Sequence, residues 1–212
     1  MLIENVNPAE IERKSMEIIE SELGDTSHLT EREKIIVKRV IHTTADFDYL
    51  QNMKFSKSAV SDALKAIKDG AVFVTDTNMA LAGISKPALN AFNCAAYCFT
   101  GDSDVSEQSK KSGTTRSAAA IDKAVKTLRG KQIIFAIGNA PTALIRLHEL
   151  INSNEISPVL VVGVPVGFVN AEQSKELIMT DNAPYIIAAG RKGGSTVSAA
   201  ICNALLYMLY KR

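Results

Sequence analysis

From residue 71 onward, short apolar runs alternate with segments that are long enough to form helices. Five such runs occupy residues 71–75, 94–99, 132–137, 158–164 and 185–189. Short runs that are apolar at successive positions, rather than at every second one, are typical of strands buried on both faces. The alternation therefore predicts a mainly parallel five-stranded sheet covered by helices on both sides, which is a three-layer α/β fold.

The first 70 residues carry a helical pattern instead. Thr30 and Glu33 are spaced as a capping box, which predicts a helix that starts there. A further helix is expected over about 57–69, closed by Gly70. Because no stretch has the composition of a linker, we expect one domain, residues 1–212, with extra N-terminal helices in front of the sheet.

Composition and charge exclude several classes of protein. Lys plus Arg number 24 and Asp plus Glu 23, a net charge of +1, so we expect no nucleic-acid partner. The longest apolar run, residues 158–169, contains Pro165 and is too short to cross a membrane. The first ten residues lack the basic and apolar regions of a signal peptide. We therefore expect a cytoplasmic protein, with its three cysteines reduced.

The carboxyl ends of the predicted strands are the first place to look for a site, because ligands bind outside those ends in a parallel sheet. The segments that follow predicted strands are 76–79, 138–141, 165–168 and 190–195. Asp76 is a lone acid at such a strand end. It is expected either to take part in the site or to hydrogen-bond a turn.

The strongest local signal is the glycine-rich segment 190–196, GRKGGST. Its glycines let backbone approach a ligand closely, and the following helix start offers free amides to an anion. Arg191 and Lys192 add positive charge, so the pattern predicts anion binding. The alternative is a tight turn with two solvated cations. The spacing matches neither the P-loop nor the dinucleotide-binding motif.

A second helix start, at Thr115 and Arg116, has the same logic. The threonine is a good cap, whereas a cation in the first turn opposes the helix dipole unless an anion compensates. The pair therefore indicates either a second anion-binding position or an ordinary helix start.

His42 is the most promising of the three histidines. It lies near a predicted helix C-terminus, where the dipole favours the protonated ring, and is followed by Thr43 and Thr44. This environment suits a general acid, although a histidine that caps the helix end is the alternative. His28 lies in a polar stretch expected to be a loop, and His148 is expected to be solvated on a helix. Because the histidines are far apart and the cysteines unclustered, no metal site is predicted.

Ser15 is a weaker candidate on the first predicted helix. It interrupts an apolar stripe, four residues after Ile11 and four before Ile19. A hydroxyl at that position is expected either to bond to backbone or to face a ligand.

Six separated stretches of this sequence resemble the precorrin-8X methylmutase family of corrin biosynthesis. They are VIHTTADFDY (40–49), DTNMALAGI (76–84), TRSAAAI (115–121), GNAPTAL (138–144), PVGFVNAEQSKE (165–176) and GRKGGSTVSAAI (190–201). The stretches occur in order and cover much of the chain, which makes the resemblance specific.

The resemblance implies a flavodoxin-like fold and a homodimer that binds its macrocycle near the subunit interface. The implied reaction moves a methyl group from C-11 to C-12 of a tetrapyrrole that carries several carboxylates. It gives cobyrinate or hydrogenobyrinate and uses no organic cofactor, and cobalt, if present, is carried by the substrate. His42 matches the family's catalytic histidine, which is thought to protonate the macrocycle.

The resemblance and the local signals together define an expected set of substrate-binding residues. It consists of Ser15, Thr43, Thr44, Asp76, Thr115, Arg116, Gly138, Asn139, Arg191, Lys192, Gly193 and Gly194.

Two other functions stay open from the sequence. A tetrapyrrole carrier would use the same pocket without chemistry and would tolerate the loss of His42. A nucleotide- or phosphate-binding module is suggested by the glycine-rich segments alone.

Overall fold

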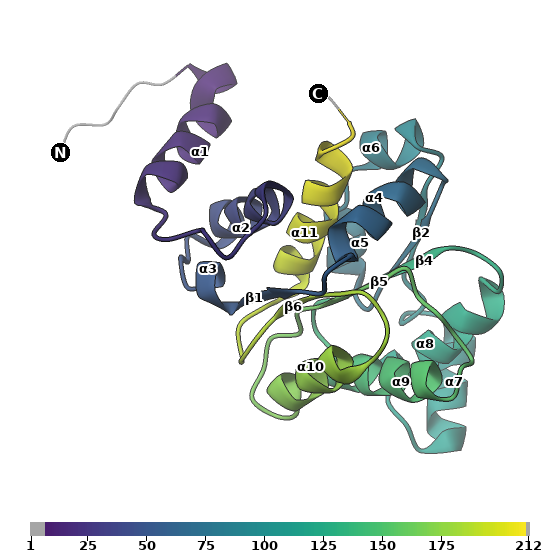
Figure 1. Ribbon diagram of the computed structural model, residues 1–212. Coiled ribbons are helices and arrows are strands. Elements are labelled where there is room, and N and C mark those ends of the chain that lie inside the picture. The colour runs from purple at the N-terminus through teal and green to yellow at the C-terminus, as the bar shows by residue number, and fades with distance from the viewer. Residues whose placement is uncertain (1–6, 211–212) are drawn as a thin grey trace.

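A six-stranded sheet forms the middle layer of the molecule (Figure 1). The computed structural model describes residues 7–210, so most of the first ten residues lie outside it. The strands are β1 (Met53–Phe55), β2 (Val72–Thr75), β3 (Ala95–Tyr97), β4 (Ile133–Ile137), β5 (Leu160–Gly163) and β6 (Tyr185–Ala188). Their order is β1-β6-β5-β4-β2-β3. Strands β2 to β6 pair in parallel, and β1 runs antiparallel beside β6.

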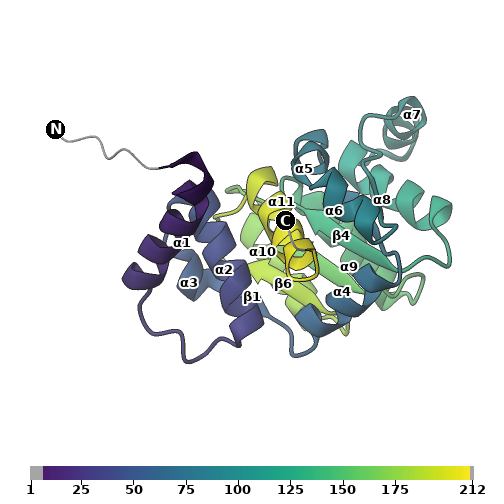
Figure 2. The same cartoon turned by 90° about the horizontal axis from the view of Figure 1, so that it is seen from above.

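Helices cover both faces of the sheet and give three layers (Figure 2). One face carries α4 (Ala59–Lys68), α5 (Asn78–Gly83), α6 (Lys86–Ala91) and α11 (Ser195–Tyr207). The other face carries α7 (Ser103–Ser112), α8 (Arg116–Thr127), α9 (Pro141–Asn152) and α10 (Ala171–Thr180). The N-terminal part adds a 3-10 turn (Pro8–Glu10), α1 (Ile11–Glu22), α2 (Glu31–Thr44) and the short α3 (Tyr49–Asn52).

Strand β4 shows why the sheet is covered twice. Ile133, Phe135 and Ile137 join the apolar core under α8, α9 and α10. Ile134 and Ala136 point the other way, into the core under α4 and α11. All five side chains are buried. Successive apolar residues therefore serve opposite faces of one strand, as the apolar runs predict.

The predicted number of strands is wrong by one. The five expected strands are present and parallel, but residues 53–55 form a sixth strand inside the segment expected to be helical. Met53 pairs with Ala188 of β6, and the side chain of Lys54 is exposed. A three-residue edge strand with a central lysine has too little apolar pattern to be distinguished from a helix end.

The expected capping box is confirmed at the start of α2. The Thr30 hydroxyl accepts a bond from the Glu33 amide, and the Glu33 carboxylate accepts one from the Thr30 amide. At its other end α2 stops at Thr44, where Ala45 adopts a left-handed conformation and its amide donates to the Ile41 carbonyl.

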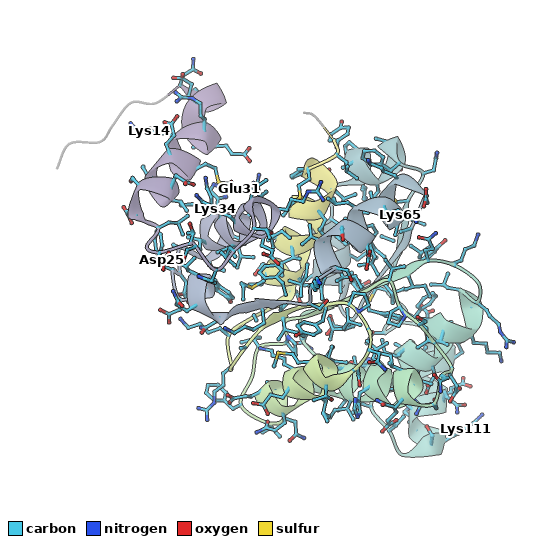
Figure 3. The ribbon with its side chains drawn as sticks, viewed as in Figure 1. Lys14, Asp25, Glu31, Lys34, Lys65 and Lys111 are labelled. Carbon is cyan, nitrogen blue, oxygen red and sulfur yellow. The ribbon has the colours of Figure 1, made fainter. Side chains whose placement is uncertain are left out.

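Helices α1 and α2 pack against each other, with ion pairs on their surface. The Glu20 carboxylate pairs with Lys34 at 2.5 Å and with Lys38 at 2.6 Å (Figure 3 labels Lys34 between the helices). The Glu12 carboxylate pairs with Arg39 at 2.8 Å. The pair of Glu12 brings the first turn of α1 to the C-terminal half of α2.

Helix α11 lies between the sheet and α2 (Figures 1 and 2). Its residues from Val197 to Leu206 are almost all buried, which explains why it is apolar around much of its surface. Cys94 and Cys202 are buried, Cys98 is half-buried, and all three are free thiols. Within residues 7–210, no helix combines the length and the apolar character needed to cross a membrane.

Candidate active site

The ends of β2 and β4 are tied together by the carboxylate of Asp76. One oxygen accepts the Gly138 amide at 2.9 Å, and the other accepts the amides of Asn139 and Ala140 at 2.8 and 2.7 Å. Asp76 is 4% exposed. Burial raises the pKa of this carboxyl, and the three amide bonds oppose the rise. The structure therefore gives Asp76 a structural task, and contact with a substrate stays a prediction.

A hollow of about 450 Å³ lies over this junction. Its lining residues are Asp76, Thr77, Asn78, Cys98, Thr100, Gly101, Thr115, Arg116, Ser117 and Asn139. Four of them, Asp76, Thr115, Arg116 and Asn139, belong to the set expected from the sequence. Thr100 and Gly101 follow the second apolar run, so the strand-end rule applied to that run would have found them. Cys98 lies within the predicted run but follows the observed strand β3.

Helix α8 begins at this hollow with the predicted cap. The Thr115 hydroxyl accepts the Ala118 amide and lies 2.8 Å from the hydroxyl of Thr142. Arg116 is exposed at the first position of the helix. No carboxylate among residues 7–210 pairs with it. An unpaired guanidinium beside a helix N-terminus can bind an anion.

The glycines of the segment 190–196 were expected to let the backbone approach a ligand. Gly193, and Gly138 after β4, instead lie where two backbone segments pass too close together for a side chain. A Cβ on Gly193 would lie 2.0 Å from the carbonyl oxygen of Val164. A Cβ on Gly138 would lie 2.8 Å from the carbonyl oxygen of Gly194. The Gly194 amide also donates to Val164 at 2.9 Å. The segment 190–194 is therefore seated against the ends of β4 and β5.

Lys175 supports this segment from beneath and was missed by the sequence analysis. Its side chain, on α10, is 0% exposed, and its ammonium donates to the carbonyl oxygens of Gly190 and Lys192, each at 2.8 Å. Burial lowers the pKa of Lys175 to about 8. The surrounding AEQSKE pattern looks like a solvated helix surface, so no local signal marks this lysine as buried.

Lys192 has partners that the sequence did not suggest. Its ammonium lies 2.5 Å from the carboxylate of Asp46 and 2.6 Å from that of Asp48. These pairs connect the segment after β6 with the turn after α2. The hydrogen bond from Lys192 holds the pKa of Asp46 below its ordinary value.

His42 lies on the last turn of α2, one helical turn before Asp46, and its side chain is exposed. The Lys192 pairs therefore bring this end of the helix next to the glycine-rich segment. The hydroxyls of Thr43 and Thr44 donate to the carbonyls of Arg39 and Val40, each at 2.9 Å. Their oxygens keep acceptor capacity, and their contact with substrate stays a prediction.

Ser15 is half-buried, and its hydroxyl donates to the carbonyl of Ile11 at 2.9 Å. Ser15 lies three residues after Glu12, whose carboxylate pairs with Arg39 on α2, three residues before His42. It does not line the hollow over Asp76. A role for Ser15 in binding stays a prediction.

The segment after β5 presents apolar side chains to solvent beside the glycine-rich segment. Phe168 is 84% exposed and Val169 is 79% exposed. The Arg191 guanidinium lies 5.5 Å from the centroid of the Phe168 ring, and the Gly167 amide donates to the Arg191 carbonyl. Arg191 is therefore held by an aromatic face rather than by a carboxylate.

The expectation for His148 is wrong. Its ring nitrogen Nδ1 lies 2.8 Å from the carboxylate of Asp181, and its side chain is largely covered. The partner lies 33 residues away in the chain, so the sequence pattern around His148 could not reveal it.

Within residues 7–210, no three His, Cys, Asp or Glu side chains form a cluster that could hold a metal ion.

Comparison with known proteins identifies the family of this chain. A family model described as precorrin-8X methylmutase matches residues 10–208. The chain belongs to the precorrin-8X methylmutase family. The cobalt-precorrin-8 methylmutase of Leptospira interrogans is 43% identical over 208 residues, covering 95% of this chain and 94% of that protein. The cobalt-precorrin-8 methylmutase of Salmonella typhimurium is 43% identical over 206 residues, covering 95% and 96%.

A solved structure of the precorrin-8x methyl mutase from Thermus thermophilus shares the architecture. It matches with a TM-score of 0.85 and 35% identity, covering 94% of this chain and 96% of that chain. The resemblance found in the sequence is thereby confirmed. Four of the six matching stretches follow strands β2, β4, β5 and β6, and the stretch 40–49 contains the end of α2. The methylmutase pattern therefore marks the edge of the sheet described above.

We expect Lys175→Met to change how stability depends on pH. The pKa of Lys175 is lowered to about 8 in the folded chain, against 10.5 for an ordinary lysine. Between these values the unfolded chain binds more protons, so the free energy of unfolding rises with pH. Between about pH 7.5 and 9.5, the wild type should gain about 2 kcal/mol relative to the variant.

Urea unfolding of both proteins at the two pH values measures this difference. Cys94 and Cys202 are buried thiols whose pKa values are raised to about 11 and about 12. Their effect on the pH dependence of stability is the same in both proteins and cancels in the comparison. Lys54→Met, which alters an exposed lysine, serves as the control. A difference between wild type and Lys175→Met that stays constant with pH would contradict the prediction.

Proposed function

We propose that the protein is an isomerase that moves a methyl group from C-11 to C-12 of a precorrin-8-type macrocycle. The observation that carries this function is the family match over residues 10–208. The named relatives act, by their descriptions, on precorrin-8X or cobalt-precorrin-8. The proposed active site consists of the segments at the carboxyl ends of the strands and the end of α2 beside them.

We propose further that the fold is a flavodoxin-like variant. Numbered along the chain, the parallel strands β2 to β6 lie in the order 2-1-3-4-5, which supports this assignment. The antiparallel strand β1 is an addition at the edge. The direction of winding reverses between β2 and β4, where ligands bind in such sheets, and the hollow over Asp76 lies at that point.

The expected substrate carries several carboxylates on a wide, flat ring. Arg116 and Arg191 are exposed at this edge of the sheet and lack carboxylate partners within the described chain. The N-termini of α8 and α11 add free amides. These groups support binding of a polycarboxylate by charge-assisted hydrogen bonds. No organic cofactor enters the proposal, and any cobalt belongs to the substrate.

His42 is proposed as the general acid. A methyl shift within one molecule breaks the methyl bond at C-11 and forms it at C-12, with no net oxidation. Protonation of the ring at one step and return of the proton at another would ease the movement of electrons, and His42 could exchange that proton. General acids contribute typically about 10²–10⁴-fold to rate. A cytoplasmic location stays a prediction.

We expect His42→Ala to lower turnover by about 10²–10⁴-fold while product affinity stays close to that of the wild type. The spectral change on conversion of precorrin-8 or cobalt-precorrin-8 to a corrin measures turnover, and a titration with hydrogenobyrinate measures affinity. His28→Ala is the control, because it removes another imidazole, whose ring contacts the Leu50 carbonyl at 3.3 Å and which is not among the expected site residues.

Activity of His42→Ala within a few-fold of the wild type would remove His42 as the acid. Wild-type protein that binds the macrocycle but never converts it would favour the carrier function instead.

We expect Arg116→Ala and Arg191→Ala to weaken product binding much more than they destabilise the fold. Each loses a charge-assisted bond worth roughly 1.5–3 kcal/mol, or about 10- to 150-fold in dissociation constant. Arg129→Ala is the matched control, since Arg129 is exposed beyond the other end of α8. Unchanged affinity at low salt in both variants would contradict the proposed anion sites.

The proposal includes a homodimer that shares its sites across the interface. The exposed side chains of Val166, Phe168 and Val169, next to the glycine-rich segment, support it because monomers rarely expose such clusters. We expect an interface that buries more than about 1,000 Å². Light scattering over a dilution series, with activity measured in parallel, tests this. A monomer that keeps full activity at nanomolar concentration would contradict the shared site.

A further inference from the structure

Lys192 joins two parts of the site that are far apart in the chain. Its ammonium lies 2.5 Å from Asp46 and 2.6 Å from Asp48, across sequence separations of 146 and 144 residues. Lys192 follows β6 and is next to Arg191 in the chain. Asp46 and Asp48 lie in the turn after α2, close to His42 in the chain. The contact therefore links the glycine-rich segment with the helix that carries the proposed acid.

The turn that holds the two aspartates is defined closely. Ala45 adopts a left-handed conformation, with φ of 54°, and its amide donates to the Ile41 carbonyl at 2.7 Å. Asp46 also accepts the amide of Asp48 at 3.0 Å. A non-glycine residue in this conformation costs free energy and persists where its surroundings fix it. The Asp46 amide also donates to the Thr44 hydroxyl at 3.3 Å, which ties Asp46 to the last turn of α2.

The other side of the contact is equally well held. Lys175, buried beneath the segment, donates to the carbonyl of Lys192 itself and to that of Gly190. The backbone from which the Lys192 side chain extends is thus anchored to α10. Because both the backbone and the ammonium of Lys192 are held, its side chain fixes the distance between the glycine-rich segment and the turn after α2.

The charge balance argues against Lys192 as a ligand of the substrate. One ammonium and two carboxylates leave this group with a formal charge of 1 − 2 = −1. A substrate carboxylate would meet a net negative group and would have to displace a partner of Lys192. Arg191, next in the chain, has an aromatic contact with Phe168 and remains open to an anion.

We propose that Lys192 is a positioning residue, which sets His42 in its place relative to the glycine-rich segment through Asp46, and not a substrate-binding residue as its sequence context suggests. This inference rests on the proposed role of His42. Its signature is a loss in kcat rather than in affinity, because a displaced acid still leaves the arginines in place.

Kinetics of Lys192→Met, Asp46→Asn and the double variant test the coupling. We expect each single variant to lower kcat by about 10- to 100-fold, the range for a misplaced catalytic group. The dissociation constant of hydrogenobyrinate should change less than about threefold. The double variant should be no slower than Lys192→Met, because loss of the ammonium already removes both ion pairs, of which Asp46→Asn removes one. Lys192→Arg, which keeps the charge, should recover most of the lost activity.

Lys123→Met is a closely matched control. Lys123 also pairs with two aspartates two residues apart, Asp102 at 2.7 Å and Asp104 at 2.6 Å, but it joins α8 to the start of α7. Loss of this pair should cost similar stability and leave kcat unchanged. Equal losses of kcat in Lys123→Met and Lys192→Met would assign the effect to general stability and overturn the proposal.

Two other results would also overturn it. A rise of tenfold or more in the dissociation constant of Lys192→Met with kcat unchanged would make Lys192 a direct ligand. Additive losses of kcat for Lys192→Met and Asp46→Asn would show that the two residues act separately.

A readout without substrate separates this inference from the proposed function. The ring proton resonances of His42, followed by NMR in the free protein, should shift in Lys192→Met and Asp46→Asn but not in Lys123→Met. Unshifted resonances would overturn the positioning role even if the enzyme is active. Shifted resonances with His42→Ala still fully active would support the linkage and reject the acid.

Discussion

One buried carboxylate fixes the junction on which the site is built. Asp76 ends β2 and accepts the amides of Gly138, Asn139 and Ala140, which follow β4. Each of these amides would lose a partner if the junction opened, and an unsatisfied buried group costs about 1–3 kcal/mol. The neighbouring strands β2 and β4 therefore end in one relative position. Arg116, which lines the hollow over Asp76, takes its place from that junction.

A second constraint brings the N-terminal helices to the same edge. Helix α11 begins directly after the glycine-rich segment and lies on the sheet, and α2 packs along it. The start of α11 and the end of α2 then meet at Lys192, which is paired with Asp46 and Asp48. Packing supplies the approximate geometry, and the ion pairs supply the final placement of residues that lie about 150 positions apart in the chain.

The sequence predicts the sheet better than it predicts the partners of polar side chains. Burial on both faces leaves a local mark, so the five parallel strands could be found, whereas the edge strand at Lys54 leaves almost none. Glycines, a lysine and acids at strand ends could be located by the same rule. The local pattern does not encode contacts between distant segments. It therefore could not show that Gly193 faces the Val164 carbonyl rather than a ligand, or that Lys192 faces Asp46 rather than a substrate.

The distribution of charge explains how a nearly neutral chain can suit a polycarboxylate. Several lysines are already paired with acidic side chains, among them Lys34, Lys123 and Lys192. Arg116 and Arg191, near the carboxyl ends of the strands, have no carboxylate partner among residues 7–210. A net charge of +1 gives little long-range attraction, and salt screens it beyond about 10 Å. Selectivity must then come from where individual guanidinium groups stand relative to the ring, and the positions of those groups are set by the junction at Asp76 and the segment above Lys175.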